Sequence, residues 1–316
     1  MDRIGPRIAV LRLVALAAIA AAASPGANFP IRAAKWLDPS QRVTALSSQP
    51  DECAAIPGDH QQRQLFEIGR AAFRAPLLLG GQAARSGLSC ASCHNNGRSN
   101  PAFRFPGLSG EPGTADVTSS LMSSHRGNGV FDPRLIPDLA VPVKISRARG
   151  DPALESFIHG LIVEEFDGAE PSRLILRGLG EYVRAIGRPG CDLARREAIQ
   201  LEAMVQDVSR AVAASRHAWT EGDPASARLL VSSARSGLGL LYERYAGPDL
   251  RRDQAAIRSA DQALLAIEQQ MDSGQASVLA QIARWQARVP NWSGVLKRDQ
   301  RRSLLEPTRL RQHLQP

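Results

Sequence analysis

The sequence predicts an all-α protein made of two parts, and two observations lead to this fold class. In the second half of the 316 residues, apolar residues recur at spacings of three and four, which is typical of amphipathic helices. In the first half, helical spacing flanks residues 75–150, which are rich in Gly, Pro, Ser and Asn. Because so long an irregular stretch builds no core from its own elements, we expect a bound group to organise it.

Residues 1–23 have the features of a signal peptide. Arg3, Arg7 and Arg12 make the beginning basic, and an apolar run that ends in three alanines follows. The run is shorter than the roughly 20 residues that span a bilayer, and nothing later is apolar enough to do so. We therefore expect a periplasmic or otherwise exported protein with no transmembrane segment in the mature chain. An uncleaved anchor is the alternative.

The first domain is predicted to cover residues 59–191, after a lead-in loop over 24–58 that shows no clear period. Three helices are expected in it. Their apolar faces are Leu65, Ile68, Ala72 and Phe73; then Leu154, Phe157, Ile158 and Leu161; then Leu174, Ile175, Leu179, Tyr182, Val183 and Ile186. Pro171 opens the third helix, and Gly187 begins the sequence that stops it.

The second domain, residues 192–295, is predicted to be a helical bundle. Four amphipathic stretches follow one another with short connections at Gly222-Asp223-Pro224, Gly247-Pro248-Asp249 and Ser273-Gly274, and Pro290 ends the last. Residues 296–316 form a basic C-terminal tail. Aromatic residues are few and do not alternate with its arginines, so the tail does not indicate nucleic-acid binding. It suits an acidic partner, or it is a disordered tail without a specific partner.

The sequence Cys90-Ala91-Ser92-Cys93-His94 has the spacing of a covalent haem-attachment site. The two thiols add across the haem vinyl groups, and the adjacent histidine becomes the proximal iron ligand. A zinc site would need two further ligands in a similar cluster, and the other two cysteines are isolated. A thioredoxin-like pair would need a βαβ context, which the Gly- and Ser-rich flanks do not provide. The motif therefore predicts one covalently attached haem c.

Two patterns flank this motif, Gly69-x-x-x-Phe73 before it and Leu179-x-x-Tyr182 well after it. Close helix crossings need a residue without a side chain and an aromatic that fills the space beside it. In these features the chain resembles the cytochrome c fold. Residues 60–190 resemble the first haem domain of the di-haem cytochrome c peroxidase/MauG superfamily. The similarity includes the segments Leu65-Phe66-Glu67-Ile68-Gly69-Arg70 and Gly87-Leu88-Ser89-Cys90. The resemblance implies a cytochrome c-type haem domain followed by the helical-bundle domain.

The chain departs from that superfamily in one respect, because members carry two haem motifs and this sequence has one. Cys191 is followed by Asp-Leu-Ala, without a second cysteine or a histidine. The helical second half is therefore not a second covalent haem domain, which argues against peroxidase chemistry that stores electrons on two haems.

The residue opposite His94 decides what the iron can do. Met122 is a candidate distal ligand, and a thioether raises the reduction potential and suits electron transfer. His125 is the runner-up and would give a lower potential. If neither binds, the iron is open, and His125 beside Arg126 could act as an acid/base pair on peroxide.

These alternatives lead to two functions. The first is an exported mono-haem c-type cytochrome that transfers electrons to or from a redox partner protein. The second is a peroxidase-like haem enzyme with an open distal site. A third possibility is that the bundle carries the activity and the haem domain supplies its electrons.

Cys53 and Cys191 lie at the two ends of the haem domain. In an oxidising compartment they could form a disulfide, which would close a very long loop. Two unpaired cysteines are the alternative, since the sequence does not give their distance.

Overall fold

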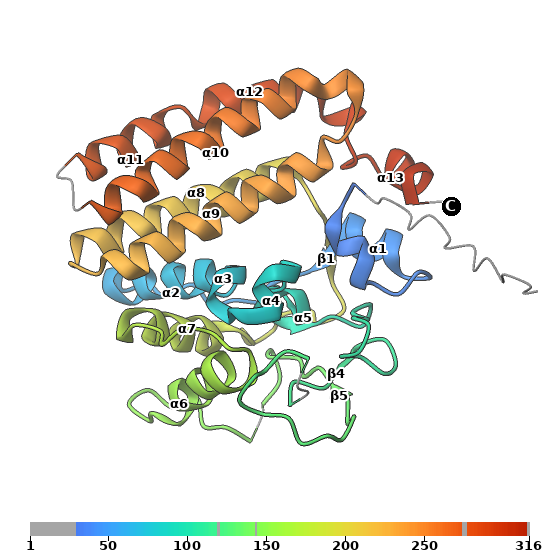
Figure 1. The fold of residues 1–316 in the computed structure, drawn as a ribbon, viewed down its shortest axis with the longest axis vertical. Helices are drawn as coiled ribbons and strands as arrows, with labels where there is room; N and C mark the ends of the chain where they lie inside the picture. Colours follow the sequence, from blue (N-terminus) through green and yellow to red (C-terminus); the bar gives the residue numbers. More distant parts are fainter. Residues whose placement is uncertain (1–29, 119–120, 143, 274–276, 315–316) are drawn as a thin grey trace, which may run out of the picture.

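The computed structural model describes residues 30–118, 121–142, 144–273 and 277–314, so the predicted signal peptide lies outside it. The described chain is mostly helical, as predicted, with three two-stranded sheets of two or three residues a strand. Figure 1 shows the long helices stacked in layers, from α10–α12 at the top through α8, α9 and α2 to α7 and α6 at the bottom. No helix in the described ranges is long and apolar enough to cross a membrane.

The first part contains two long helices that cross and several short elements. Helix α2 (His60–Ala72) begins at Asp59, whose side chain accepts a hydrogen bond from the Gln62 backbone N–H, and helix α7 begins at Ser172 in the same way. The elements of this part are α2, α3 (Pro76–Leu79), α4 (Gly81–Ser86), α5 (Cys90–Cys93), β2 (His94–Asn95), β3 (Arg98–Ser99), β4 (Thr114–Ala115), β5 (Arg134–Leu135), α6 (Ala153–Gly160), a π-helical segment η2 (Leu161–Glu165) and α7 (Arg173–Ala185).

Helices α2 and α7 meet at two glycines. A Cβ atom on Gly69 would lie 1.9 Å from the Gly178 carbonyl oxygen, so only glycine allows the two backbones to approach this closely. The rings of Phe73 and Tyr182 pack beside the crossing with their centroids 5.0 Å apart. The sequence predicted a glycine and aromatic contact between these helices, and Gly178 is the partner that it did not identify.

The second part is a set of antiparallel helices, as the spacing of apolar residues predicted. Its elements are β6 (Arg196–Ala198), α8 (Leu201–Thr220), α9 (Pro224–Arg244), η3 (Pro248–Leu250), α10 (Arg251–Asp272), α11 (Val278–Ala287), α12 (Val289–Asp299), η4 (Gln300–Arg302) and α13 (Pro307–Leu314). Pro290 lies in the first turn of α12 instead of only ending α11, because a proline at this position loses no helical hydrogen bond.

The two ends of the described chain differ from the expected loop and tail. Residues 24–58 include η1 (Arg32–Trp36), α1 (Arg42–Ser47) and β1 (Ser48–Pro50), and β1 pairs antiparallel with β6. Helix α13 packs on α1, and both contribute to one buried apolar cluster that contains Ile31, Ala34, Leu37, Leu46, Ala102, Leu304, Leu310 and Leu314. Figure 1 shows α1 and α13 beside each other at the right. Each segment orders because the other covers its few apolar residues.

The described chain contains two further buried apolar clusters, a large core and a small core. The large core runs without interruption from α2 and α7 into α8–α12, so it joins the two predicted domains. The small core lies among the short elements around α5. Its buried members are Leu79, Ala83, Leu88, Phe103, Leu108, Ala115, Met122, Ile136 and Phe166, with Trp36, Cys90, Cys93, Phe105 and Val117 packed at its edge.

Candidate haem site

The motif cysteines lie on α5, a single turn that the surrounding chain holds in place. Ser89 and Ser92 cap its beginning reciprocally, and the Ser89 N–H donates to Ser92 Oγ at 3.0 Å. The Ala91 N–H donates to the Phe73 carbonyl at 3.1 Å, which connects the motif to the end of α2. The helical turn therefore places Cys90 and Cys93 on the edge of the small core.

Both motif thiols are free, and both cysteines are half-buried. Burial raises the pKa of the Cys90 thiol to about 12, and burial followed by the charge of Cys90 does the same for Cys93. Cys90 also contacts the large core, so it lies where the two cores meet. Both thiols thus border an apolar region, as thioether bonds to a haem would require.

The His94 ring is oriented by a backbone carbonyl. Its Nδ1 lies 3.0 Å from the Pro137 oxygen, and because a carbonyl only accepts, Nδ1 carries the proton. The other nitrogen, Nε2, then keeps its lone pair, and it makes no hydrogen bond within the described part of the chain. Burial lowers the pKa of His94 to about 4, so the ring is neutral at physiological pH. A neutral imidazole with a free Nε2 is the form that binds a metal.

The structure separates the two candidate distal ligands. Met122 is 1% exposed and belongs to the small core that both motif cysteines border. The His125 side chain is 62% exposed, and its Nε2 lies 3.9 Å from a carboxylate oxygen of Asp167. Arg126 forms ion pairs with Glu164 and Glu165 on η2. Of the two predicted ligands, only Met122 therefore shares a core with Cys90 and Cys93.

A half-buried ionic network lies behind the His94 loop. Tyr182 donates to a Glu52 oxygen at 2.9 Å, and Arg70 donates to the same oxygen at 2.8 Å. Arg74 bridges Glu52 and the Asn96 side chain, at 3.1 and 2.8 Å. Burial alone would raise the pKa of Glu52, but Arg74 and Arg70 hold it below its ordinary value. Glu52 therefore stays charged and connects α2 and α7 to the residues that follow His94.

The disulfide that the sequence left open is formed between Cys53 and Cys191, whose Cα atoms lie 5.7 Å apart. The Cys53 carbonyl also accepts hydrogen bonds from the Gly187 and Arg188 N–H groups. The bridge thus attaches the lead-in segment to the chain that leaves α7.

Sequence reasoning missed Pro137, Arg98 and Asp138. Arg98 forms a two-oxygen contact with Asp138, the residue after Pro137. No local pattern reveals these residues, because about forty positions separate Arg98 and His94 from their partners.

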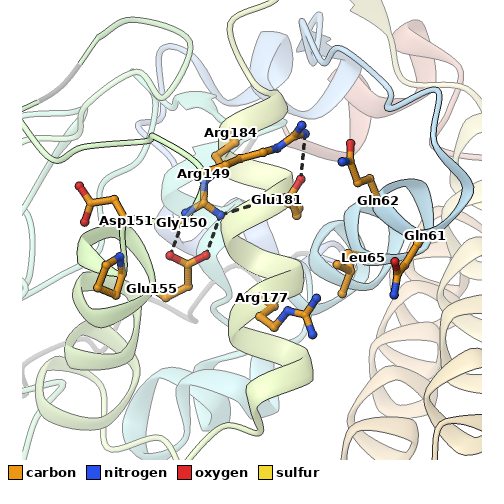
Figure 2. A pocket seen from close by; sticks show the side chains of 11 residues that line it. Gln61, Gln62, Leu65, Arg149, Gly150, Asp151, Glu155, Arg177, Glu181 and Arg184 are labelled. Atoms are coloured by element: carbon orange, nitrogen blue, oxygen red, sulfur yellow. Dashed lines mark hydrogen bonds and ion pairs between the residues drawn. The ribbon is translucent and has the colours of Figure 1, made fainter.

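A concave region lies between the N-terminal end of α2 and helices α6 and α7. It has a volume of about 430 Å³ and is lined by three arginines and three acidic residues, Arg149, Arg177, Arg184, Asp151, Glu155 and Glu181. Figure 2 shows ion pairs among these side chains, which include Arg184 with Glu155 and Arg149 with Glu181. The six charges balance, so this surface provides no excess charge for binding an ionic ligand.

Comparison with protein-family models, with curated proteins and with solved structures finds no match to this chain.

Proposed function

We propose that this protein is an exported mono-haem c-type cytochrome that transfers electrons to or from a redox partner protein. Cys90 and Cys93 would hold haem c covalently, and His94 and Met122 would ligate its iron. When bound, the haem supplies an iron that gains or loses one electron. The single observation that carries the proposal is the arrangement of the motif: two thiols at the edge of an apolar core and a histidine whose Nδ1 is already bonded.

The chain's own residues support this function in three ways. The Pro137 carbonyl fixes the tautomer of His94, which leaves Nε2 for the metal. The small core excludes water from the region that Cys90 and Cys93 border. Met122 reaches this core, and a thioether ligand stabilises the reduced iron and raises its potential.

The peroxidase-like alternative needs an acid/base group beside an open iron. His125 and Arg126 were its candidates, and both are engaged with acidic side chains at the surface. The exposure of His125 and the burial of Met122 favour the electron carrier.

The test is to express the full chain in a host that attaches haem c and to look for haem that remains bound after denaturation. We expect one covalent haem per chain, absent from the double variant Cys90→Ser/Cys93→Ser. The matched control is Cys53→Ser/Cys191→Ser, which removes the other two cysteines and should keep the haem. A wild-type chain that retains no haem contradicts the proposal. A high-spin spectrum that shifts when cyanide or peroxide is added would indicate an open iron site. The peroxidase-like enzyme would then replace the electron carrier as the proposed function.

A further inference from the structure

Arg98 is a buried cation whose three nitrogens all have partners. The residue is 5% exposed and lies on β3, directly after the turn that follows His94. Its Nε lies 2.8 Å from one oxygen of Asp138 and 2.9 Å from the other, and a terminal nitrogen donates to the second at 2.7 Å. That nitrogen also donates to the Leu193 carbonyl at 3.1 Å, and the third contacts the Cys53 sulfur at 3.8 Å.

The Arg98–Asp138 pair fixes the segment that contains Pro137. One Asp138 oxygen accepts the Ala140 N–H at 2.8 Å, and the Leu139 N–H donates to the Gly97 carbonyl at 3.0 Å. The short β2–β3 hairpin, in which Asn95 pairs with Arg98, thus holds residues 138–140 through both backbone and side chain. Because Pro137 is bonded directly to Asp138, its carbonyl is held beside the His94 ring.

We infer that Arg98 is a positioning residue for the proximal iron ligand: through Asp138 it places the Pro137 carbonyl that orients His94. The inference rests on the proposed function, because it assigns a role toward the bound haem. The hydrogen bond from Nδ1 makes the imidazole a more basic ligand, which stabilises the oxidised iron. Weakening the Arg98–Asp138 pair therefore raises the reduction potential without changing any residue that touches the haem.

The test compares Arg98→Lys with the wild-type holoprotein. Lysine keeps the charge but loses the planar fork that engages both carboxylate oxygens. Two quantities are measured, the reduction potential and the exchange rate of the His94 Nδ1 proton by NMR of the reduced protein. We expect a higher potential and exchange about fivefold faster, the factor that corresponds to the loss of a hydrogen bond of ordinary net strength. Asp138→Asn removes the same ion pair from the other side and is expected to change both quantities in the same direction.

The matched control is Arg235→Lys. Arg235 lies on α9 in the bundle, and it donates to Asp261 at 2.9 Å and to Glu268 at 2.8 Å, both on α10. Its replacement breaks a comparable ion pair and is expected to leave the potential unchanged.

The outcomes separate the two claims. A wild-type chain without covalent haem overturns the proposed function and this inference with it. If the variants carry haem and keep the wild-type potential and exchange rate, the inference alone is wrong. If Arg235→Lys shifts the potential as much as Arg98→Lys does, the effect is a general loss of stability and the positioning role is also wrong.

Discussion

At the scale of single residues, Met122 and His125 are three positions apart and have opposite surroundings. Met122 lies in the small core, among buried apolar side chains. His125 lies near Asp167 at the surface, and its backbone N–H donates to Ser123 Oγ at 3.1 Å. Methionine and histidine side chains both ligate haem iron in proteins. The burial of these two side chains, and not their chemistry, therefore distinguishes the candidates.

The first prediction at this scale concerns Met122→Ala in the haem-loaded protein. We expect loss of the weak red charge-transfer band of methionine ligation and a lower reduction potential, because the thioether favours reduced iron. Optical spectra and a redox titration measure both.

The control for that experiment is Met271→Ala, which truncates a methionine 3% exposed in the bundle. It should cost about 2–5 kcal/mol of unfolding free energy through the cavity that it leaves, and it should not change the spectrum. An unchanged spectrum in Met122→Ala would exclude Met122 as the distal ligand.

The sequence predicted those residues of the candidate site that lie close together along the chain. Cys90, Cys93 and His94 stand out because, under the proposed function, covalent attachment would dictate their spacing along the chain. Arg98 and Asp138 do not, because an ion pair between distant positions leaves no periodic signal. The choice of distal ligand likewise depends on burial, which only the folded chain decides.

At the scale of secondary structure elements, the crossing of α2 and α7 depends on backbone contact. A Cβ on Gly178 would lie 2.9 Å from the Gly69 nitrogen, so each glycine makes room for the other helix. The contact brings Tyr182 within reach of Glu52, which in turn pairs with Arg70 of α2.

The second prediction is that Gly69→Ala destabilises the protein. The added methyl group meets the Gly178 backbone, which cannot move without separating the helices, so we expect a loss of about 1–3 kcal/mol or more in unfolding free energy. Denaturant unfolding measures it.

Gly294→Ala in α12 is the matched control, because no atom lies within 4 Å of the new methyl group. It should be neutral or stabilise the protein by up to about 1 kcal/mol, since alanine has the higher helix propensity. Equal stabilities of the two variants would mean that the crossing tolerates a side chain.

The long helices were predictable because each has enough apolar residues to show a period. Helices α2, α7, α8, α9, α10 and α11 all follow the expected stretches. Helix α12 was missed because Pro290 ends one helix in sequence patterns and equally begins another. Helices α1 and α13 were missed because each has few apolar residues. These residues are buried only where the two helices pack together.

At the scale of the whole molecule, the first part, which contains α2 and α7, and the bundle are joined more closely than two domains with a linker. The large core is continuous between them, and Ser233 of α9 donates to the Ala71 carbonyl of α2 at 2.7 Å. The Arg70 and Arg74 side chains also pair with Asp207 of α8. The bundle therefore supports α2, whose C-terminal end is hydrogen-bonded to the segment that contains Cys90 and Cys93.

The third prediction concerns the bridge between Cys53 and Cys191, whose sequence separation is 138 residues. Removing it by Cys53→Ser/Cys191→Ser should lower the unfolding free energy by about 5 kcal/mol, because the unfolded chain regains the freedom of a very long loop. Chemical denaturation with and without reductant measures this. Reductant should destabilise the wild type and leave the double variant unaffected; a bridge that stabilises by less than about 1 kcal/mol would contradict the expectation.

The burial of the motif thiols has a consequence for how the protein matures. Burial raises the pKa of both thiols, so at neutral pH they are protonated, and the thiolate is the reactive form. Under the proposed function, a chain that folds before it binds haem has partly buried the two thiols that must react with the haem vinyl groups. Attachment then competes in time with collapse of the small core, and a chain that collapses first must reopen before it can be completed.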